Sequence, residues 1–220
     1  YIIMSDELDG FEDKLNLTDD DYNKYYSQIN EENNKEKLRV ISIEVQRTLS
    51  KEFINQNPDF SNNLEEVLKT FIISCPNQNY LSGMSFIAKM ILKLSNNNKI
   101  KAFIVLKNIF EEKNIKDLYE NKLENIKNKF VVKLKEKIPL LFQHLEKNKI
   151  DFNFGPYWLM TLLCYNFDDS ISEYVFKLFI KKRDFDIYIN ALLAILKTLE
   201  NELLKKNNLE IFIVLNSIKI

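Results

Sequence analysis

Residues 41–48 read ISIEVQRT, and they complete a stretch in which Leu38, Ile41 and Val45 recur at helical spacing. In a helix these three apolar side chains share one face, and the polar residues between them point elsewhere. The pattern therefore predicts a helix that ends near Arg47, at the C-terminal end of this stretch.

Arg47 is unusual in a chain that carries nearly all of its positive charge on lysine. The only arginines are Arg39, Arg47 and Arg183. A planar guanidinium that is always charged binds a phosphate in a fixed orientation better than a flexible ammonium does. A second interpretation is open, because a cation in the last turn of a helix also stabilises the helix dipole.

A second short stretch, YLSGMS at residues 80–85, opens the most clearly amphipathic segment of the chain. Met84, Ile87 and Ile91 lie at positions i, i+3 and i+7 of this segment, which predicts a helix with one apolar face. We expect a helical scaffold that holds this turn and the Arg47 end of the first helix together.

The same helical period recurs along the chain, and no segment alternates convincingly between apolar and polar residues. With 3 Gly and 4 Pro among 220 residues, the chain has few residues for tight turns. The predicted fold class is all-α, with ten or more helices. We expect a partly ordered lead-in over residues 1–18 and a single multi-helix domain over residues 19–220.

Local signals predict where several of these helices begin and end. Residues 50–63 and 113–120 are interpreted as connections. Asn62 is expected to cap a helix that Pro76 ends. The nearly uniform apolar run at residues 157–167 predicts one buried central helix.

The balance of charges argues against a global attraction to nucleic acid or to a membrane surface. The chain has 31 basic and 32 acidic residues. Cys75 and Cys164 lack CxxC spacing, and we expect them to be reduced, buried thiols of an intracellular protein. His144 is the single histidine, so a zinc site lacks ligands. No apolar run reaches the roughly 20 residues of a membrane span.

Common catalytic and nucleotide-binding motifs are missing from the sequence. It contains no G-x-S-x-G, no G-x-x-x-x-G-K-[ST] and no G-x-G-x-x-G. The acidic residues 19–21 lack the spacing of an EF-hand and are interpreted as a solvated helix start. His144 is expected at the surface or its boundary, and Trp158 in the core rather than in an interface.

Three segments, read in order, carry a resemblance to a known family. They are Ile41-x-x-Glu44-x-x-Arg47-Thr48, then Tyr80-x-x-Gly83-Met84, then a helix bearing Trp158. The set resembles the TBC domain, the helical family of GTPase-activating proteins for Rab-type small GTPases, across about residues 20–200. In that family the first motif reads I-x-x-D-x-x-R-T and the second reads Y-x-Q-G-M.

The resemblance implies roles for the residues of the first motif. Arg47 would be an arginine finger that reaches the γ-phosphate of GTP bound to the partner. Glu44 stands where the family has aspartate and would orient Arg47, and Thr48 would brace the same loop. We expect the Arg47 guanidinium to be unpaired and outward-facing, at the mouth of a helical groove beside the turn that carries Ser82.

The second motif departs from the family at one position. Ser82 stands where the family has a glutamine finger that positions the attacking water, and a serine hydroxyl is too short to replace it. Tyr80, Gly83 and Met84 match the motif and would support the turn. In the third motif, Phe176 and Lys177 replace a tryptophan and an aspartate.

Three functional hypotheses remain open from the sequence. The chain is a Rab-type GTPase activator that works through Arg47 alone, a catalytically weak relative that binds such a GTPase as a scaffold or effector, or a generic helical interaction domain. The resemblance implies a Rab-type GTPase as partner, with GTP and Mg²⁺ belonging to that partner, no cofactor of the chain's own and no metal site. It also implies vesicle trafficking and a cytoplasmic protein, peripheral to endomembranes through its partner.

Overall fold

The computed structural model describes residues 8, 15–31, 34–75, 80–120, 123–165 and 167–217. Over these ranges the chain forms thirteen α-helices and no strand, which confirms the all-α prediction. The backbone divides into two compact units, residues 1–112 and 113–220. The single domain expected over residues 19–220 stays a prediction, and Pro76 and most of the expected lead-in lie outside the described residues.

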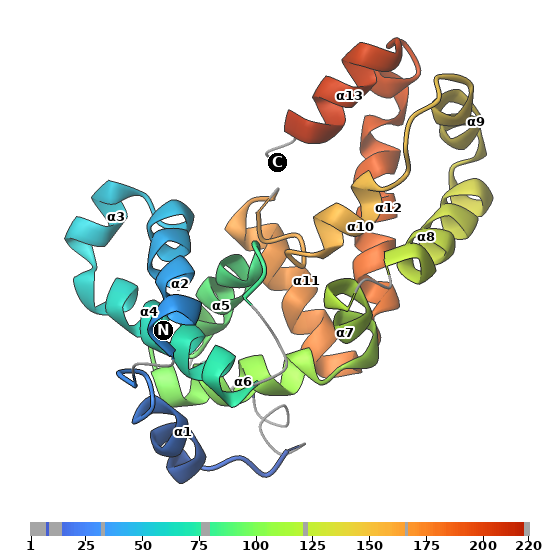
Figure 1. The fold of residues 1–220 in the computed structure, drawn as a ribbon. Coiled ribbons are helices and arrows are strands. Elements are labelled where there is room, and N and C mark those ends of the chain that lie inside the picture. Colours follow the sequence, from blue (N-terminus) through green and yellow to red (C-terminus); the bar gives the residue numbers. More distant parts are fainter. Residues whose placement is uncertain are drawn as a thin grey trace, which may run out of the picture. The chain divides into compact units, whose positions relative to one another are not determined.

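Unit 1 is built around the helix α4, which contacts all the other helices of the unit (Figure 1). Its helices are α1 (Asp19–Tyr26), α2 (Lys35–Thr48), α3 (Lys51–Gln56), α4 (Pro58–Ser74), α5 (Met84–Leu94) and α6 (Lys99–Phe110). The apolar face predicted for α4 is buried, at Leu64, Val67, Leu68, Phe71 and Ile72. Helix α2 lies against both α4 and α5, and this placement positions the site described below.

The prediction of a connection at residues 50–63 is wrong. Helix α3 and the beginning of α4 occupy nearly all of this range. Pro58 begins α4 instead of interrupting the chain, since the first turn of a helix needs no N–H donor there. Ser50 caps α3 by accepting a hydrogen bond from the Phe53 N–H at 3.1 Å. Asn62 therefore lies inside α4 and does not cap it.

Unit 2 is organised around α8, which contacts α7, α9, α10 and α12. Its helices are α7 (Lys113–Tyr119), α8 (Leu123–Lys137), α9 (Pro139–Lys147), α10 (Phe154–Leu159), α11 (Asp169–Lys182), α12 (Asp186–Leu203) and α13 (Asn208–Ser217). Lys133 Nζ on α8 binds Asp186 Oδ2 at the start of α12, at 2.7 Å. None of the described helices is both long enough and apolar enough to span a membrane.

Two predictions about unit 2 are wrong. Residues 113–120 form α7 instead of a connection, and the apolar run at residues 157–167 is not one helix. The chain leaves the helical conformation after α10, with φ values of 48° and 66° at Leu162 and Leu163. Leu162 and Leu163 are buried, and Ser172 donates a hydrogen bond to the Leu163 carbonyl at 3.0 Å, which satisfies that buried acceptor. An apolar run alone does not distinguish a buried helix from a buried turn.

Candidate functional site

The C-terminal end of α2 and the turn before α5 meet within unit 1, as the sequence predicts. Thr48 Oγ1 and Ser85 Oγ are joined by a hydrogen bond of 2.6 Å, and Thr48 Oγ1 also lies 2.8 Å from the Glu44 carbonyl oxygen. Ser85 is fully buried and Thr48 is partly buried. This hydrogen bond fixes the last turn of α2 against the first turn of α5.

The Glu44 carboxylate lies between the two sequence motifs and binds a residue from each. Its Oε1 accepts a hydrogen bond from Arg47 Nη1 at 2.8 Å, and its Oε2 accepts one from Ser82 Oγ at 3.3 Å. Only 8% of the Glu44 surface is exposed. A nearly buried carboxylate therefore contacts a side chain from each of the two motifs.

We expected an unpaired, outward-facing Arg47. The side chain does face outward, but it is paired. Its side chain is 72% exposed, and its guanidinium forms an ion pair with Glu44. An exposed ion pair of this kind contributes about 0–1 kcal/mol, so the pair orients Arg47 without holding it tightly. The guanidinium is planar and has five N–H donors, and its hydrogen bond to Glu44 comes from one nitrogen, Nη1.

The turn before α5 depends on the backbone of Gly83. Gly83 has φ 104° and ψ −22°, a left-handed conformation that residues with a Cβ rarely adopt. The turn places Ser82 next to Glu44 and sends Met84, which is fully buried, into the core. Glycine at this position is therefore explained by geometry.

Tyr80 supports the same turn from the inside. Its hydroxyl is buried and makes no hydrogen bond that meets normal geometry with another described residue. Burial raises the pKa of the Tyr80 phenol, and the nearby Glu44 carboxylate raises it further, while Ser85 lowers it. The phenol is therefore neutral and is not available as a base at neutral pH.

The arrangement offers a cation for binding an anion and no nucleophile of its own. Among the described residues, no group of three or more histidine, cysteine, aspartate or glutamate side chains is placed to hold a metal ion. The site presents to solvent the Arg47 guanidinium, oriented by a carboxylate behind it, and Ser82, which is also exposed. Ser85 belongs to the site through its hydrogen bond to Thr48, and the sequence did not predict this role.

The remaining residues singled out from the sequence lie elsewhere. Trp158 is 4% exposed and belongs to the core of unit 2, as expected. His144 is half-buried, with Nε2 3.0 Å from the Lys206 carbonyl oxygen. Asp21 accepts a hydrogen bond from the Thr18 N–H at 2.9 Å, so this acid belongs to a helix start.

Four further positions can be compared with the expectations. Cys75 and Cys164 form no disulfide, and both are partly exposed, so the prediction of buried thiols is wrong. Phe176, which the resemblance matches to a tryptophan of the third motif, is fully buried in unit 2. Lys177, which the resemblance matches to an aspartate, pairs with Glu173 at 2.7 Å one turn earlier on α11.

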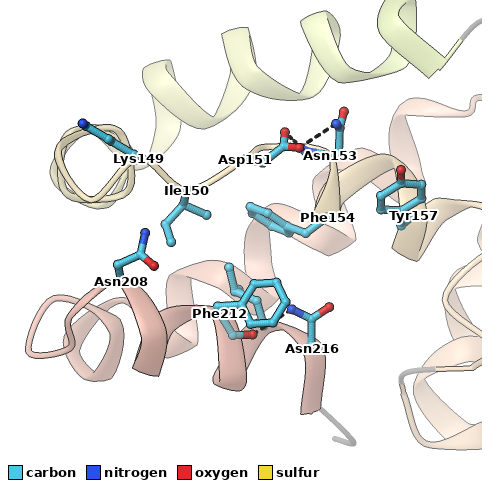
Figure 2. A pocket seen from close by; sticks show the side chains of 10 residues that line it. Lys149, Ile150, Asp151, Asn153, Phe154, Tyr157, Asn208, Phe212 and Asn216 are labelled. Atoms are coloured by element: carbon cyan, nitrogen blue, oxygen red, sulfur yellow. Dashed lines mark hydrogen bonds between the residues drawn. The ribbon is translucent and has the colours of Figure 1, made fainter.

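One pocket in each unit is formed by described residues, and neither of these two is lined by Arg47 or Ser82, so neither is the groove that we expected beside them. The pocket in unit 1 has a volume of about 380 Å³ and polar walls that include Glu65 and Glu66. The pocket in unit 2 has a volume of about 310 Å³ and lies between the chain around α10 and the helix α13. Figure 2 shows Phe154 and Phe212 on its two sides.

Comparisons with known proteins agree with the fold and with the motifs. The structure is similar to the crystal structure of the Chlamydomonas flagellar RabGAP TBC domain, with a TM-score of 0.79 and 18% sequence identity. The match covers 94% of this chain and 69% of that chain, and it defines the fold as that of a TBC domain. The model of the Rab-GTPase-TBC domain family matches residues 5–204. The chain belongs to this family.

Proposed function

We propose that the chain is a GTPase-activating protein for a Rab-type small GTPase and that Arg47 is its arginine finger. Family membership supports the class of activity. The observation that carries the proposal is the contrast between Arg47, which is 72% exposed, and the Glu44 carboxylate that orients it from a nearly buried position. An arginine finger must be exposed enough to reach the partner's active site, and its guanidinium must also have a defined orientation.

The chemistry that Arg47 supplies is electrostatic. During phosphoryl transfer, negative charge spreads over the oxygens of the γ-phosphoryl group and the leaving group, and a guanidinium placed against them stabilises that charge. Arginine fingers accelerate hydrolysis by roughly 10³–10⁵-fold, which corresponds to about 4–7 kcal/mol of activation free energy. Arg47 forms the same kind of charge-assisted hydrogen bond with Glu44 in the free protein.

Ser82 does not take over the role of a glutamine finger in this proposal. Its hydroxyl donates to Glu44 Oε2 at 3.3 Å, so the side chain is directed at its own protein. The attacking water is then positioned by a glutamine of the partner GTPase, as it is in GTPases that use an activator supplying only arginine.

The contact between Ser82 and Glu44 also favours a second candidate function. A domain without a water-positioning side chain binds a Rab-type GTPase through the same surface and accelerates hydrolysis weakly or not at all. Such a domain would act as a scaffold or an effector. The generic interaction domain that the sequence left open gains no support from the family match.

GTP hydrolysis by a panel of Rab-type GTPases, measured with and without the domain, separates these functions. We expect acceleration of at least one GTPase and loss of that acceleration in Arg47→Ala. Arg47→Lys keeps the charge but not the planar fork, and we expect it to lose most of the rate. Arg183→Lys makes the same exchange at an exposed position in unit 2 and is expected to leave the rate unchanged.

The other outcomes of this experiment are equally informative. Binding of a GTPase without acceleration supports the scaffold, and Ser82→Gln is then expected to raise the hydrolysis rate. If no Rab-type GTPase binds the domain, neither function stands.

A further inference from the structure

The outward face of α2 carries two apolar side chains next to Arg47. Val40 is 49% exposed and Ile43 is 45% exposed, whereas Ile41 and Val45 on the opposite side of the helix are buried. Ile43 lies one helical turn before Arg47, and Val40 lies two turns before it. Leu38, Ile41 and Val45 already supply the face that α2 buries, so Val40 and Ile43 are not needed to attach it.

Arginine borders this apolar strip at both ends. Arg39 is exposed and lies one turn before Ile43, and Arg47 lies one turn after it. Arg39, Ile43 and Arg47 therefore form one continuous row along the helix, with Val40 beside it. Two of the three arginines in the sequence lie on this one face. We call Arg39, Val40, Ile43 and Arg47 the α2 strip.

The size of a protein–protein interface determines how much of α2 a partner at Arg47 covers. A helix rises 1.5 Å per residue, so Ile43 is about 6 Å and Val40 about 10 Å from Arg47 along the axis. A standard protein–protein interface buries about 800 Å² on each partner, which as a round patch has a radius of about 16 Å. A partner that brings a phosphate group to Arg47 from the outward side of α2 therefore also covers Ile43 and Val40.

The composition of the strip fits this position near the centre of an interface. Interface centres are apolar and depleted of lysine and glutamate, and arginine is enriched in them. The α2 strip has a similar composition, with apolar side chains in the middle and a guanidinium at each end. The complementary surface is an apolar patch bordered by carboxylates, close to a bound nucleotide.

We propose that the α2 strip is a docking surface for the nucleotide-bound GTPase, with Val40 and Ile43 as apolar anchors and Arg39 as an electrostatic guide. This inference rests on the proposed function, because it takes Arg47 to act on that partner. It assigns affinity to Val40 and Ile43 and leaves the chemical step to Arg47. The two roles are separable by kinetics.

Steady-state GTP hydrolysis tests the division, with a responsive Rab-type GTPase in its GTP form as the varied substrate. We expect Ile43→Glu and Val40→Glu each to lower kcat/KM by about tenfold or more through KM, with kcat changed by less than twofold. Arg47→Ala should instead lower kcat. Arg39→Glu is expected to slow association at low salt, with a smaller effect at high salt.

Val132→Glu is the matched control, because Val132 is 56% exposed on α8 and receives the same substitution as Val40. It is expected to leave KM unchanged. Circular dichroism and thermal unfolding of each variant show whether it is folded, and exposed positions tolerate this exchange. Ile43→Ala is a second variant, with an expected smaller rise in KM.

The results that overturn the inference differ from those that overturn the proposed function. Unchanged KM in folded Ile43→Glu and Val40→Glu, with the wild-type domain still active, removes the docking surface and leaves the activity. An equal rise in KM for Val132→Glu also overturns it. If the wild-type domain binds a GTPase without accelerating hydrolysis, and Ile43→Glu weakens that binding, the docking surface stands and the arginine finger does not.

Discussion

Glu44 is the residue on which the geometry of the site depends. One carboxylate oxygen contacts Arg47, three residues later on the same helix, and the other contacts Ser82, which is 38 residues away in sequence. The first contact follows from helical spacing. The second requires the fold to bring the turn before α5 to α2, and then requires a short side chain to point inward.

Replacement of Glu44 tests whether orientation of Arg47 matters for activity. Glu44→Gln keeps the shape but loses the charge, and one of its two polar atoms becomes a donor that faces Arg47 or Ser82. We expect kcat for GTPase activation to fall about tenfold, consistent with the loss of one hydrogen bond to a charged group. KM should stay within twofold of the wild type. Glu44→Asp restores the family's residue and is expected to stay within about threefold of the wild-type rate.

The opposite results identify a different role. Suppose that Glu44→Gln lowers the free energy of unfolding by as much as it raises the activation free energy, and that Glu44→Asp is no better than Glu44→Gln. Glu44 would then only support the fold. Urea unfolding of the same variants supplies that comparison.

Part of the geometry around Arg47 was predictable from sequence, because helical spacing is a local feature. The helical period placed Arg47 at the end of a helix, and the structure places that end at Thr48. We expected Glu44 to orient Arg47, but we did not predict that the two side chains form an ion pair in the free protein. Exposure of Val40 and Ile43 was also missed, because the sequence does not say which apolar residues a helix leaves uncovered.

The start of α5 shows how one helix depends on a single backbone conformation. Gly83 adopts φ 104° immediately before the first residue of α5, and a left-handed conformation costs a residue with a Cβ about 1–2 kcal/mol. Glycine is otherwise scarce, with 3 in the sequence. The choice of glycine here therefore reflects the turn rather than a flexible connection.

Gly83→Ala is expected to lower the free energy of unfolding by about 1–2 kcal/mol. It is also expected to lower GTPase activation, because the turn holds Ser82 against Glu44. Urea unfolding measures the first effect. Gln46→Ala, at an exposed position in α2, is the control and should change stability by less than about 0.5 kcal/mol. An unchanged stability in Gly83→Ala would contradict the strained conformation.

Other helices show where sequence patterns are ambiguous. Pro58 was interpreted as part of a connection, yet proline is compatible with the first turn of a helix, and α4 begins there. The run at residues 157–167 was interpreted as one helix because a buried turn can be as rich in apolar residues as a buried helix. Only the hydrogen bonds of the turn, such as that from Ser172 to Leu163, distinguish the two.

Both units contain tyrosines whose hydroxyl groups are buried. Tyr22 and Tyr80 belong to unit 1 and Tyr188 to unit 2, and burial raises the pKa of all three phenols. The folded state therefore favours the neutral phenol. Tyr188 packs against Phe179 and Phe185, with ring centroids 5.3 and 5.8 Å away, and its hydroxyl has no hydrogen-bond partner among the described residues.

These shifts predict that the protein loses stability in alkaline solution. A phenol in the unfolded chain ionises near pH 10, and in the folded state it ionises only at higher pH. Its contribution is complete below about pH 10 and is lost as the pH rises toward the folded pKa. Urea unfolding between about pH 8 and pH 11 should show this fall.

Tyr188→Phe is expected to reduce the alkaline loss. It should also raise stability at neutral pH by about 1 kcal/mol, since it removes a buried hydroxyl without a partner. Tyr174→Phe, at a residue that is 65% exposed, is the control and should change neither quantity. A stability that stays constant to pH 11 in the wild type would contradict the burial of these phenols.

In the proposed function, the exposed guanidinium of Arg47 supplies most of the catalytic effect. The most direct test is the single-turnover rate of GTP hydrolysis by a responsive Rab-type GTPase, with the domain in saturating excess. We expect Arg47→Ala to lower this rate by at least about 100-fold, while the affinity for the GTPase changes by less than about fivefold. A rate within about threefold of the wild type in Arg47→Ala would contradict it.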